Sequence, residues 1–460
     1  MNARAPLVVI DIVGLTPSLV GPDTPQLSSL AADGFRAVLD PVLPAVTCTA
    51  QATMLTGSLP REHGVVGNGW YFRDLAEVMF WRQSNRLVAG EKLWEVARRR
   101  RPELSTAVLF WWFNMYSSAE RSVTVRPIYP ADGRKIPALY SSPPDLAARL
   151  EAELGQRFPF FHFWGPKSGL ASSDWIAAAA LALFRRERPG LLLVYLPHLD
   201  YDMQRLGPGH PGIPGEVRAI DRMAGRLIDG VRAEGAEVVV LSEYGLEDAT
   251  LPVHLNRVLR DAGLLAVRET LGWELLDPGG SRAFAVADHQ VAHIYVADPA
   301  DIERVAALIA AQPGVAEVLG RAGQAQVGLD HERAGELVAV AEPGAWFTYY
   351  YWLDDARAPD FARTVDIHRK PGYAPVELFL DPDRPLVKGR VLFNLARKAA
   401  GFRYLMDVIP LRADLVKGTH GRTRVDPQRG PVLLCSNRKG MTERLPMTGV
   451  RDFLLGQLCD

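Results

Sequence analysis

Short apolar runs alternate with longer segments of helical periodicity along most of the chain. The clearest runs are Leu7–Ile10, Ala107–Phe110, Leu191–Leu196 and Val238–Leu241. Apolar runs of this length are typical of buried strands, and the segments between them place apolar residues at helical spacing. The pattern therefore predicts an α/β fold.

Two consecutive units show this plan most clearly. The segment Ser173–Arg186 predicts a helix that ends before Pro189-Gly190, and Leu191–Leu196 follows as a run that is apolar on both faces. The segment Glu216–Glu234 predicts a second helix, which precedes the strand Glu237–Leu241. Strands that are apolar on both faces belong in the middle of a mostly parallel sheet with helices on both sides.

The pattern changes between residues 265 and 374, where alternating, aromatic-rich segments surround one helix. The strand-like segments there are Ala292–Val296, Glu336–Ala341 and Phe347–Trp352. We interpret residues 265–374 as an inserted α+β cap, and residues 1–264 and 375–460 as one catalytic α/β domain. Val376–Leu380 is expected to return to the main sheet, and Gly430–Cys435 to add one more strand.

The composition excludes several classes of protein. Of 460 residues, 48% are hydrophobic, and 52 Lys and Arg nearly balance 53 Asp and Glu. The chain therefore has no overall basic field to attract a nucleic acid polymer or an anionic bilayer, although a local basic patch remains possible. The longest apolar runs are shorter than the roughly 18 to 20 residues that span a bilayer, so we expect no membrane span.

Cysteine usage and the N-terminus suggest a compartment. The three cysteines are Cys48, Cys435 and Cys459, too few and too scattered for a disulfide framework. The stretch before the first strand, Met1–Ala5, is too short for a signal peptide. We therefore expect a cytoplasmic protein.

Polar and acidic residues follow the predicted strands. Asp11 follows the first strand, His198 and Asp200 follow Leu191–Leu196, and Glu243 follows Val238–Leu241. Ligands of doubly wound sheets bind beyond the carboxyl ends of the strands, and several carboxylates at one edge would repel each other without a cation. The pattern favours a metal site, although any single aspartate there could be a turn former or a helix cap.

A threonine-rich segment supplies a candidate nucleophile. Thr47 lies in the first turn of a predicted short helix that ends at Gly57. A helix N-terminus and an adjacent cation both stabilise an alkoxide and bind phosphate oxygens. The alternative is an ordinary N-cap, worth about 1 kcal/mol of helix stability.

These residues resemble the alkaline phosphatase superfamily, specifically the nucleotide pyrophosphatase/phosphodiesterase branch and its relative phosphonoacetate hydrolase. The matching positions are Asp11, Thr47, Thr56-Gly57, Pro60-Arg-Glu-His63-Gly64, Asn68, Asp200, Ser242-Glu243-Tyr244-Gly245 and Gly418-Thr419-His420-Gly421. The resemblance covers most of the chain outside the insertion. It implies an alkaline phosphatase-like three-layer α/β/α fold with a mostly parallel central sheet.

The resemblance also implies two divalent metal ions, in this family zinc. One ion would be held by Asp11, Thr47 and the pair Glu243 and Tyr244. The other ion would be held by Asp200, Gln204 and His420. Thr47 would be the nucleophile, and Asn68 would bind a substrate oxyanion.

The chain departs from the family at the metal ligands. Glu243 replaces an aspartate, whereas Tyr244 and Gln204 replace histidines and are uncommon zinc ligands. Three histidines are candidates to complete the set: His254, His368 and His289. An oxygen-rich site would also admit Mn²⁺ or Mg²⁺.

The predicted function is metal-dependent hydrolysis of a phosphodiester or pyrophosphate bond in a small, nucleotide-like substrate. A phosphonate or phosphomonoester hydrolase is an alternative, in which Lys370 or Arg369 would meet the additional charge. A non-catalytic binding relic of the fold is a second alternative, because two ligands are replaced. Charge balance near Thr47, where Ala50-Gln51-Ala52 is neutral, favours diesters.

Overall fold

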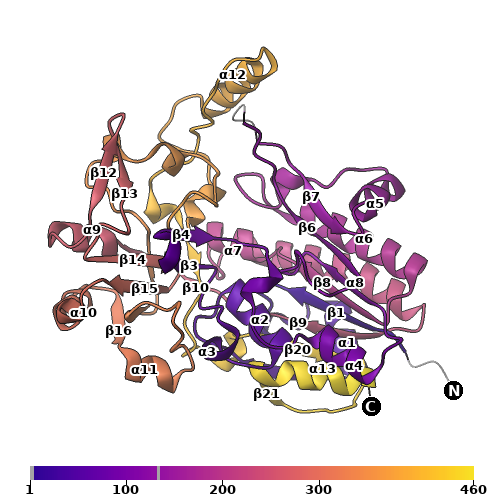
Figure 1. The fold of residues 1–460 in the computed structure, drawn as a ribbon. Coiled ribbons are helices and arrows are strands. Elements are labelled where there is room, and N and C mark those ends of the chain that lie inside the picture. The colour runs from indigo at the N-terminus through magenta and orange to yellow at the C-terminus, as the bar shows by residue number, and fades with distance from the viewer. Residues whose placement is uncertain (1–4, 132–134, 460) are drawn as a thin grey trace.

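The computed structural model describes residues 5–131 and 135–459. Figure 1 shows an α/β region built on a large central sheet and a second lobe beside it with a smaller sheet. The α/β fold class with a mostly parallel central sheet is confirmed. The two regions have separate hydrophobic cores.

The main sheet has nine strands in the order β21-β2-β20-β9-β1-β8-β5-β6-β7. Their bounds are β1 Leu7–Ile12, β2 Phe35–Asp40, β5 Thr106–Leu109, β6 Arg121–Val125, β7 Leu139–Ser142, β8 Leu191–Leu196, β9 Glu237–Leu241, β20 Val432–Cys435 and β21 Arg444–Pro446. The five strands from β9 to β6 are parallel, whereas β20 and β7 pair antiparallel with their neighbours. The central β1 and β8 are buried along their whole length, as two-sided apolar runs require.

Helices pack in two groups around this sheet. The first group is α1 Pro25–Asp33, α5 Leu146–Leu154, α6 Leu170–Glu187 and α8 Ile213–Arg232; the second is α2 Thr47–Thr56, α4 Leu93–Arg100 and α13 Val450–Cys459. The short helices α3 Pro60–His63 and α7 Asp200–Leu206 lie in connections. The predicted helices 173–186 and 216–234 are present as α6 and α8.

The second lobe is built on an antiparallel sheet in the order β14-β15-β17-β16. Its elements are α9 Leu255–Asp261, β14 Ala283–Asp288, β15 Val291–Val296, α10 Ile302–Ala310, β16 Val315–Leu319, α11 Arg321–Gln326 and β17 Leu337–Ala341. Four two-stranded pairs complete the fold: β3 Gly69–Phe72 with β4 Glu77–Phe80, β10 Glu247–Asp248 with β19 Gly418–Thr419, β11 Leu251–Val253 with β18 Ala345–Phe347, and β12 Val267–Thr270 with β13 Trp273–Leu276.

The chain leaves the second lobe later than the sequence predicts. The prediction of a strand at Val376–Leu380 is wrong, because Pro375–Leu378 forms a 3₁₀ helix. Proline has no backbone N–H and a fixed φ, so it suits the first turn of a helix better than a central strand. The second core includes residues from Ala249 to Val416, and the chain then returns to the main sheet through β20, as predicted for 430–435, and through β21.

The helix α12, Val387–Ala399, projects from the rest of the molecule (Figure 1). It lies within the part of the chain that builds the second core, and Val387 and Val391 pack against that core. Within residues 5–131 and 135–459, none of the helices is both long enough and apolar enough to cross a membrane.

Candidate active site

Three buried carboxylates lie at the carboxyl edge of the main sheet. Asp11 is in β1, Asp200 begins α7 after β8, and Glu243 follows β9. The parallel pairing of β1 with β8 and β9 brings these side chains to the same edge. Glu243 is close enough to Asp11 for their carboxyl groups to share a hydrogen bond.

Burial makes these carboxylates difficult to ionise. Desolvation raises the pKa of Asp11 and that of Asp200 to about 7 each, and raises the pKa of Glu243 well above its ordinary value. The like charge of Asp11 adds to the effect on Glu243. A cation at this edge would favour the ionised carboxylates, because opposite charge lowers the pKa of a carboxyl group.

The amide of Gln51 lies between two of the carboxylates. Its Nε2 donates to Asp11 Oδ2 over 3.2 Å and to Glu243 Oε1 over 2.6 Å, while its Oε1 accepts the Trp112 backbone N–H over 2.8 Å. From the sequence we interpreted Gln51 only as a neutral neighbour of Thr47. Its position four residues after Thr47 on one helix face is the signal that places both side chains at the same site.

Thr47 is the first residue of α2 and is 3% exposed. The N-cap residue is Val46, and no side chain makes a cap hydrogen bond there, so Thr47 is not the cap. The Thr47 Oγ1 lies 3.1 Å from the Tyr244 hydroxyl oxygen and also interacts with the Glu243 carboxylate. The Thr47 hydroxyl therefore does not cap the helix, and it lies beside the Glu243 carboxylate.

A column of four stacked rings adjoins Thr47. Tyr244 lies on His420 with ring centroids 3.5 Å apart, His420 on His289 at 3.7 Å, and His289 on Tyr373 at 3.8 Å. Among the three histidines proposed as replacements, His289 is the one whose ring packs on His420, at an interplanar angle of 37°. Its Nδ1 is buried without a hydrogen-bond partner among the described residues.

His420 has the form of a metal ligand. Its Nδ1 lies 2.8 Å from the Ala45 carbonyl oxygen, which can only accept, so Nδ1 carries the proton and Nε2 keeps its lone pair. That Nε2 is 3.9 Å from Asp200 Oδ1. Burial lowers the pKa of His420 to about 3, so the ring is neutral at ordinary pH.

Gln204 bonds to Asp200 within α7. Its Nε2 donates to Asp200 Oδ2 over 2.6 Å, and its Oε1 accepts from the Tyr373 hydroxyl over 3.0 Å. The amide thus orients Asp200 and leaves its Oδ1 directed away from this bond. Gln204 acts through Asp200 in this arrangement.

Asn68 is fixed next to the first turn of α2. Its Oδ1 accepts the Cys48 backbone N–H over 3.0 Å, and its Nδ2 donates to Asp288 Oδ1 over 3.0 Å. Asp288 Oδ2 also accepts the Asn68 backbone N–H over 2.7 Å. One of the two Nδ2 hydrogens therefore remains for a ligand oxygen, since an amide nitrogen carries two donors.

The structure does not bring His254 to the carboxylates. His254 precedes α9 in the second lobe, where its Nδ1 lies 2.7 Å from Thr348 Oγ1 and its ring stacks on Tyr350. His368 lies in the wall of the cavity described below, with its Nδ1 3.4 Å from the Phe80 carbonyl oxygen. Both rings have partners outside the carboxylate site.

Lys370 is also engaged elsewhere. Its Nζ lies 2.5 Å from Glu377 Oε1 and donates to the Thr364 carbonyl oxygen over 2.9 Å. Both ionic side chains are almost fully buried, at 1% and 0% exposure. Lys370 therefore joins two segments of the second lobe and offers no charge to a substrate.

The carboxylate site fits divalent cations. Three buried oxygens there have no hydrogen-bond partner within the described part of the chain: Asp11 Oδ1, Glu243 Oε2 and Asp200 Oδ1. Ionised oxygens without donors, beside a neutral imidazole, are a suitable donor set for a hard or borderline cation. Elsewhere in the described chain, potential ligand atoms of His198, Asp202 and Glu216 all lie within 4.8 Å of one another. His198 Nε2 lies 3.0 Å from Glu216 Oε2 in this group.

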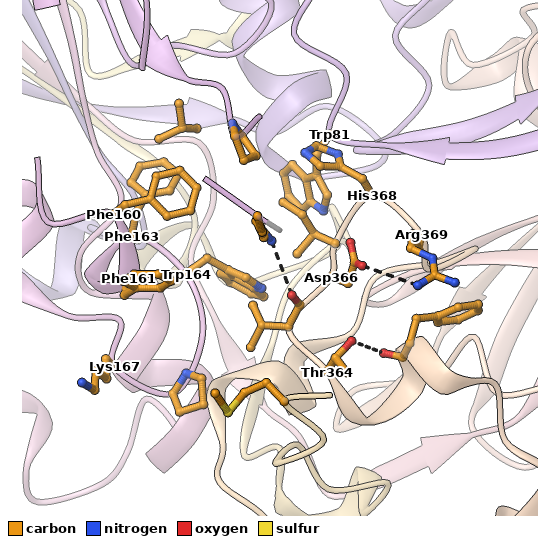
Figure 2. A pocket seen from close by; sticks show the side chains of 18 of the residues that line it. Trp81, Phe160, Phe161, Phe163, Trp164, Lys167, Thr364, Asp366, His368 and Arg369 are labelled. Atoms are coloured by element: carbon orange, nitrogen blue, oxygen red, sulfur yellow. Dashed lines mark hydrogen bonds and ion pairs between the residues drawn. The ribbon is translucent and has the colours of Figure 1, made fainter. Parts of the chain in front are cut away.

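A cavity of about 930 Å³ leads from Thr47 and Asn68 to the surface. In Figure 2 the aromatic side chains of 160–164 lie on one side of it and face Trp81 and the segment 364–369 on the other. The basic side chains in its wall are Arg126, Lys135, Lys167, Arg369, Lys388 and Lys398. The cavity is large enough for a phosphoester with a bulky apolar group.

A site at the carboxyl edge of this sheet, with a second lobe beside it, is the architecture of alkaline phosphatase superfamily hydrolases. A solved phosphonoacetate hydrolase from Sinorhizobium meliloti 1021 matches with a TM-score of 0.64 and 15% identity, over 99% of this chain and 96% of that one. Murine ectonucleotide pyrophosphatase/phosphodiesterase 5 matches with a TM-score of 0.59 and 15% identity, over 99% and 95%. At these identities the likeness shows the fold alone.

Sequence comparison identifies the family. The profile of type I phosphodiesterase / nucleotide pyrophosphatase matches residues 7–374, so the chain belongs to this family of enzymes, and the resemblance inferred from the sequence is confirmed. An uncharacterized pyrophosphatase/phosphodiesterase of Schizosaccharomyces pombe is 25% identical over 58% of this chain and 49% of its own length. Human ectonucleotide pyrophosphatase/phosphodiesterase family member 1 is 22% identical over 52% and 23%. The match thus spans about half of the yeast protein and less than a quarter of the human one.

Proposed function

We propose that this enzyme hydrolyses a phosphodiester or pyrophosphate bond in a small molecule with a bulky apolar group, and that Thr47 is the nucleophile. The observation that carries the proposal is the position of the Thr47 hydroxyl. It lies at the N-terminus of α2, beside Glu243 and Tyr244, and at the inner end of the large cavity. A hydroxyl held beside a base at a helix N-terminus is suited to attack an anionic phosphorus centre.

The first step transfers the phosphoryl group to the enzyme. A bond forms between Thr47 Oγ1 and phosphorus, the bond from phosphorus to the leaving oxygen breaks, and the hydroxyl proton passes to Glu243. Asn68 Nδ2 donates its remaining hydrogen to a phosphoryl oxygen. The proton on Glu243 then passes to the leaving oxygen. In the second step water attacks phosphorus through its oxygen and loses a proton to Glu243, the bond from phosphorus to Oγ1 breaks, and that proton passes to Thr47 Oγ1.

Asp11, Glu243 and Thr47 would hold one divalent cation, and Asp200 with His420 would hold a second. When bound, such cations stabilise charge on the phosphoryl oxygens and lower the pKa of a nucleophilic oxygen. The set is richer in oxygen than a typical zinc site, so Mn²⁺ or Mg²⁺ also suits it beside Zn²⁺. His254, His368 and Lys370 are not part of this proposal.

A phosphonate or phosphomonoester is the second candidate substrate. The cations Lys135, Lys167 and Arg369 in the cavity wall favour it, because such substrates carry additional negative charge. Arg369 is partly neutralised by Asp360, which lies 3.1 Å away. Diesters remain the main proposal, since the side chains next to Thr47 supply no extra cation.

Substitution of the threonine tests the nucleophile. Thr47→Ala is expected to lower kcat on the order of 10³-fold, and Thr47→Ser to lower it less, because serine keeps the attacking oxygen. Thr49→Ala is the matched control on the same helix, since Thr49 Oγ1 donates to the Val65 carbonyl oxygen outside the cavity wall. Turnover by the alanine variant close to that of the native enzyme would contradict the proposal.

The same preparation tests the substrate class on matched p-nitrophenyl substrates. We expect kcat/KM for the diester to exceed that for the monoester by at least about tenfold, because the inner site offers few charges for a dianion. Equal rates or a monoester advantage would favour the second candidate. Full activity in excess chelator, with no metal detected in the protein, would reject the cation sites.

A further inference from the structure

The segment 384–406 exposes an unusual amount of apolar surface. Its large apolar side chains and their exposed fractions are Leu386 86%, Leu392 69%, Phe393 63%, Leu395 46%, Phe402 66% and Leu405 45%. Scattered single apolar residues on a surface are ordinary, but a contiguous group on one projecting element indicates a binding surface.

Four apolar residues of α12 form one face. Leu392, Leu395, Ala396 and Ala399 follow the spacing i, i+3, i+4 and i+7, which places them on one side of a helix. All four are exposed. The opposite side is held to the protein by Asn394, whose Nδ2 donates to the Leu405 carbonyl oxygen over 2.9 Å. The apolar face is therefore left without a partner within the described chain.

All charged residues of the segment 384–406 are basic. Residues 384–406 contain six basic residues and no acidic one: Arg384, Lys388, Arg390, Arg397, Lys398 and Arg403. Asp407 engages Arg384 and Arg390 at 2.8 and 2.7 Å. The other four basic side chains have no carboxylate within ion-pair distance among the described residues. These residues form a local basic patch, which is not evident from the nearly neutral overall charge of the chain.

The segment also forms the rim of the active-site cavity. Lys388, Val391, Leu392, Leu395 and Lys398 line it, together with Thr47 at its inner end. The helix α12 that carries these residues projects from the body of the protein (Figure 1). A surface that received the apolar face of α12 would therefore lie next to the entrance of the cavity.

We propose that α12 and its flanks, residues 384–406, dock the enzyme on an anionic lipid bilayer, with the cavity entrance beside the membrane surface. A helix with an exposed apolar face and flanking Lys and Arg is the form that lies in the bilayer interface, where the apolar side chains enter the acyl boundary and the cations meet lipid phosphates. The proposal concerns attachment to the surface and does not depend on the proposed reaction.

Co-sedimentation with vesicles tests the proposal without any measurement of activity. The full chain is mixed with vesicles of phosphatidylcholine alone or with about 30 mol% phosphatidylserine. We expect binding to the anionic vesicles that weakens when NaCl is raised from about 0.1 to about 0.5 M, because salt screens the basic flanks. No binding to the anionic vesicles would overturn the proposal.

Two variants separate the apolar and the basic contributions. Phe393→Ser with Phe402→Ser removes two exposed rings outside the cavity wall and is expected to lower the vesicle partition coefficient at least about tenfold. Arg397→Gln with Lys398→Gln is expected to lower it by a similar factor and to remove the preference for phosphatidylserine. Met441→Ser is the matched control, because Met441 is 64% exposed and lies outside this segment.

Three further outcomes would contradict docking on a lipid bilayer. Equal binding by the Phe variant and by Met441→Ser would overturn the proposal, provided that all variants keep the native Tm. A native dimer that the Phe variant converts to a monomer would assign the face to a second copy of the chain. Binding to an RNA homopolymer in place of vesicles would assign the basic residues to nucleic acid.

Discussion

Gln51 shows how one neutral side chain holds this site together. Its amide donates to two buried carboxylates and accepts a backbone N–H from Trp112. Buried carboxylates need donors or cations, because an uncompensated buried charge is costly. We therefore regard Gln51 as a positioning residue that shares this role with a divalent cation.

This role leads to a prediction for Gln51→Ala. Without a divalent cation the variant is expected to lose about 1–3 kcal/mol of unfolding free energy, because it leaves buried polar groups unsatisfied. Saturating Mn²⁺ should restore more stability to the variant than it adds to the native protein. Urea unfolding with and without Mn²⁺ measures both, and Gln428→Ala, at an exposed position, is the control. The same loss with and without the ion would contradict the shared role.

At the scale of elements, the segment after β18 is fixed by a buried ion pair. Lys370 and Glu377 are in contact at 2.5 Å, and Glu377 also accepts from the Trp164 indole over 2.6 Å. Trp164 lines the cavity. The pair therefore ties the 3₁₀ helix Pro375–Leu378 to a wall of the active site.

Lys370→Met tests whether this lysine is structural. The variant is expected to lose about 3–5 kcal/mol of stability, because Glu377 would remain buried without its cation. The double variant Lys370→Met with Glu377→Leu should lose less, since neither charge then remains. Chemical denaturation of the three proteins measures the difference. An unchanged stability together with a large loss of kcat/KM would instead indicate that Lys370 binds substrate.

At the scale of the whole molecule, the site is assembled from distant parts of the chain. Asp11 comes from the first strand, Asp200 and Glu243 follow the central strands β8 and β9, and His420 directly follows β19. The carboxylates lie in or just after strands of the main sheet. The imidazole comes from the segment that follows the second lobe. Their burial explains why the pKa values of these groups move so far.

The raised pKa values predict how cation binding depends on pH. Asp11 and Asp200 have pKa values of about 7, so protons compete with a cation below that pH. A single such group weakens binding about tenfold between pH 8 and pH 6. His420 has a pKa of about 3 and stays neutral across this range. Isothermal titration with Mn²⁺ at both pH values measures the effect, and equal affinities would contradict the assignment of these carboxylates as ligands.

In protein without bound metal, the same pKa shifts determine whether stability rises or falls with pH. Asp11 and Asp200 bind protons more tightly when folded than when unfolded, so their contribution to stability is present below about pH 4 and is lost as the pH rises towards 7. His420 acts in the opposite direction, and its contribution is lost as the pH falls from about 6.5 towards 3.

The sequence by itself determined the α/β class, the strands β1, β8 and β9, and the position of Thr47 at the start of a helix ended by Gly57. These features depend on local periodicity, on turn residues and on burial of both faces of a strand, which neighbouring residues encode. The family resemblance came from short motifs of the same local kind.

The tertiary structure alone decided which side chains meet. It placed His289 against His420, inserted Gln51 between Asp11 and Glu243, and left His254 with Thr348. It also kept Val376, Val408 and Val416 in the second core, although the sequence predicted a return to the main sheet from Val376. Such contacts join residues far apart in the chain, so they depend on the packing of whole elements, which local patterns do not specify.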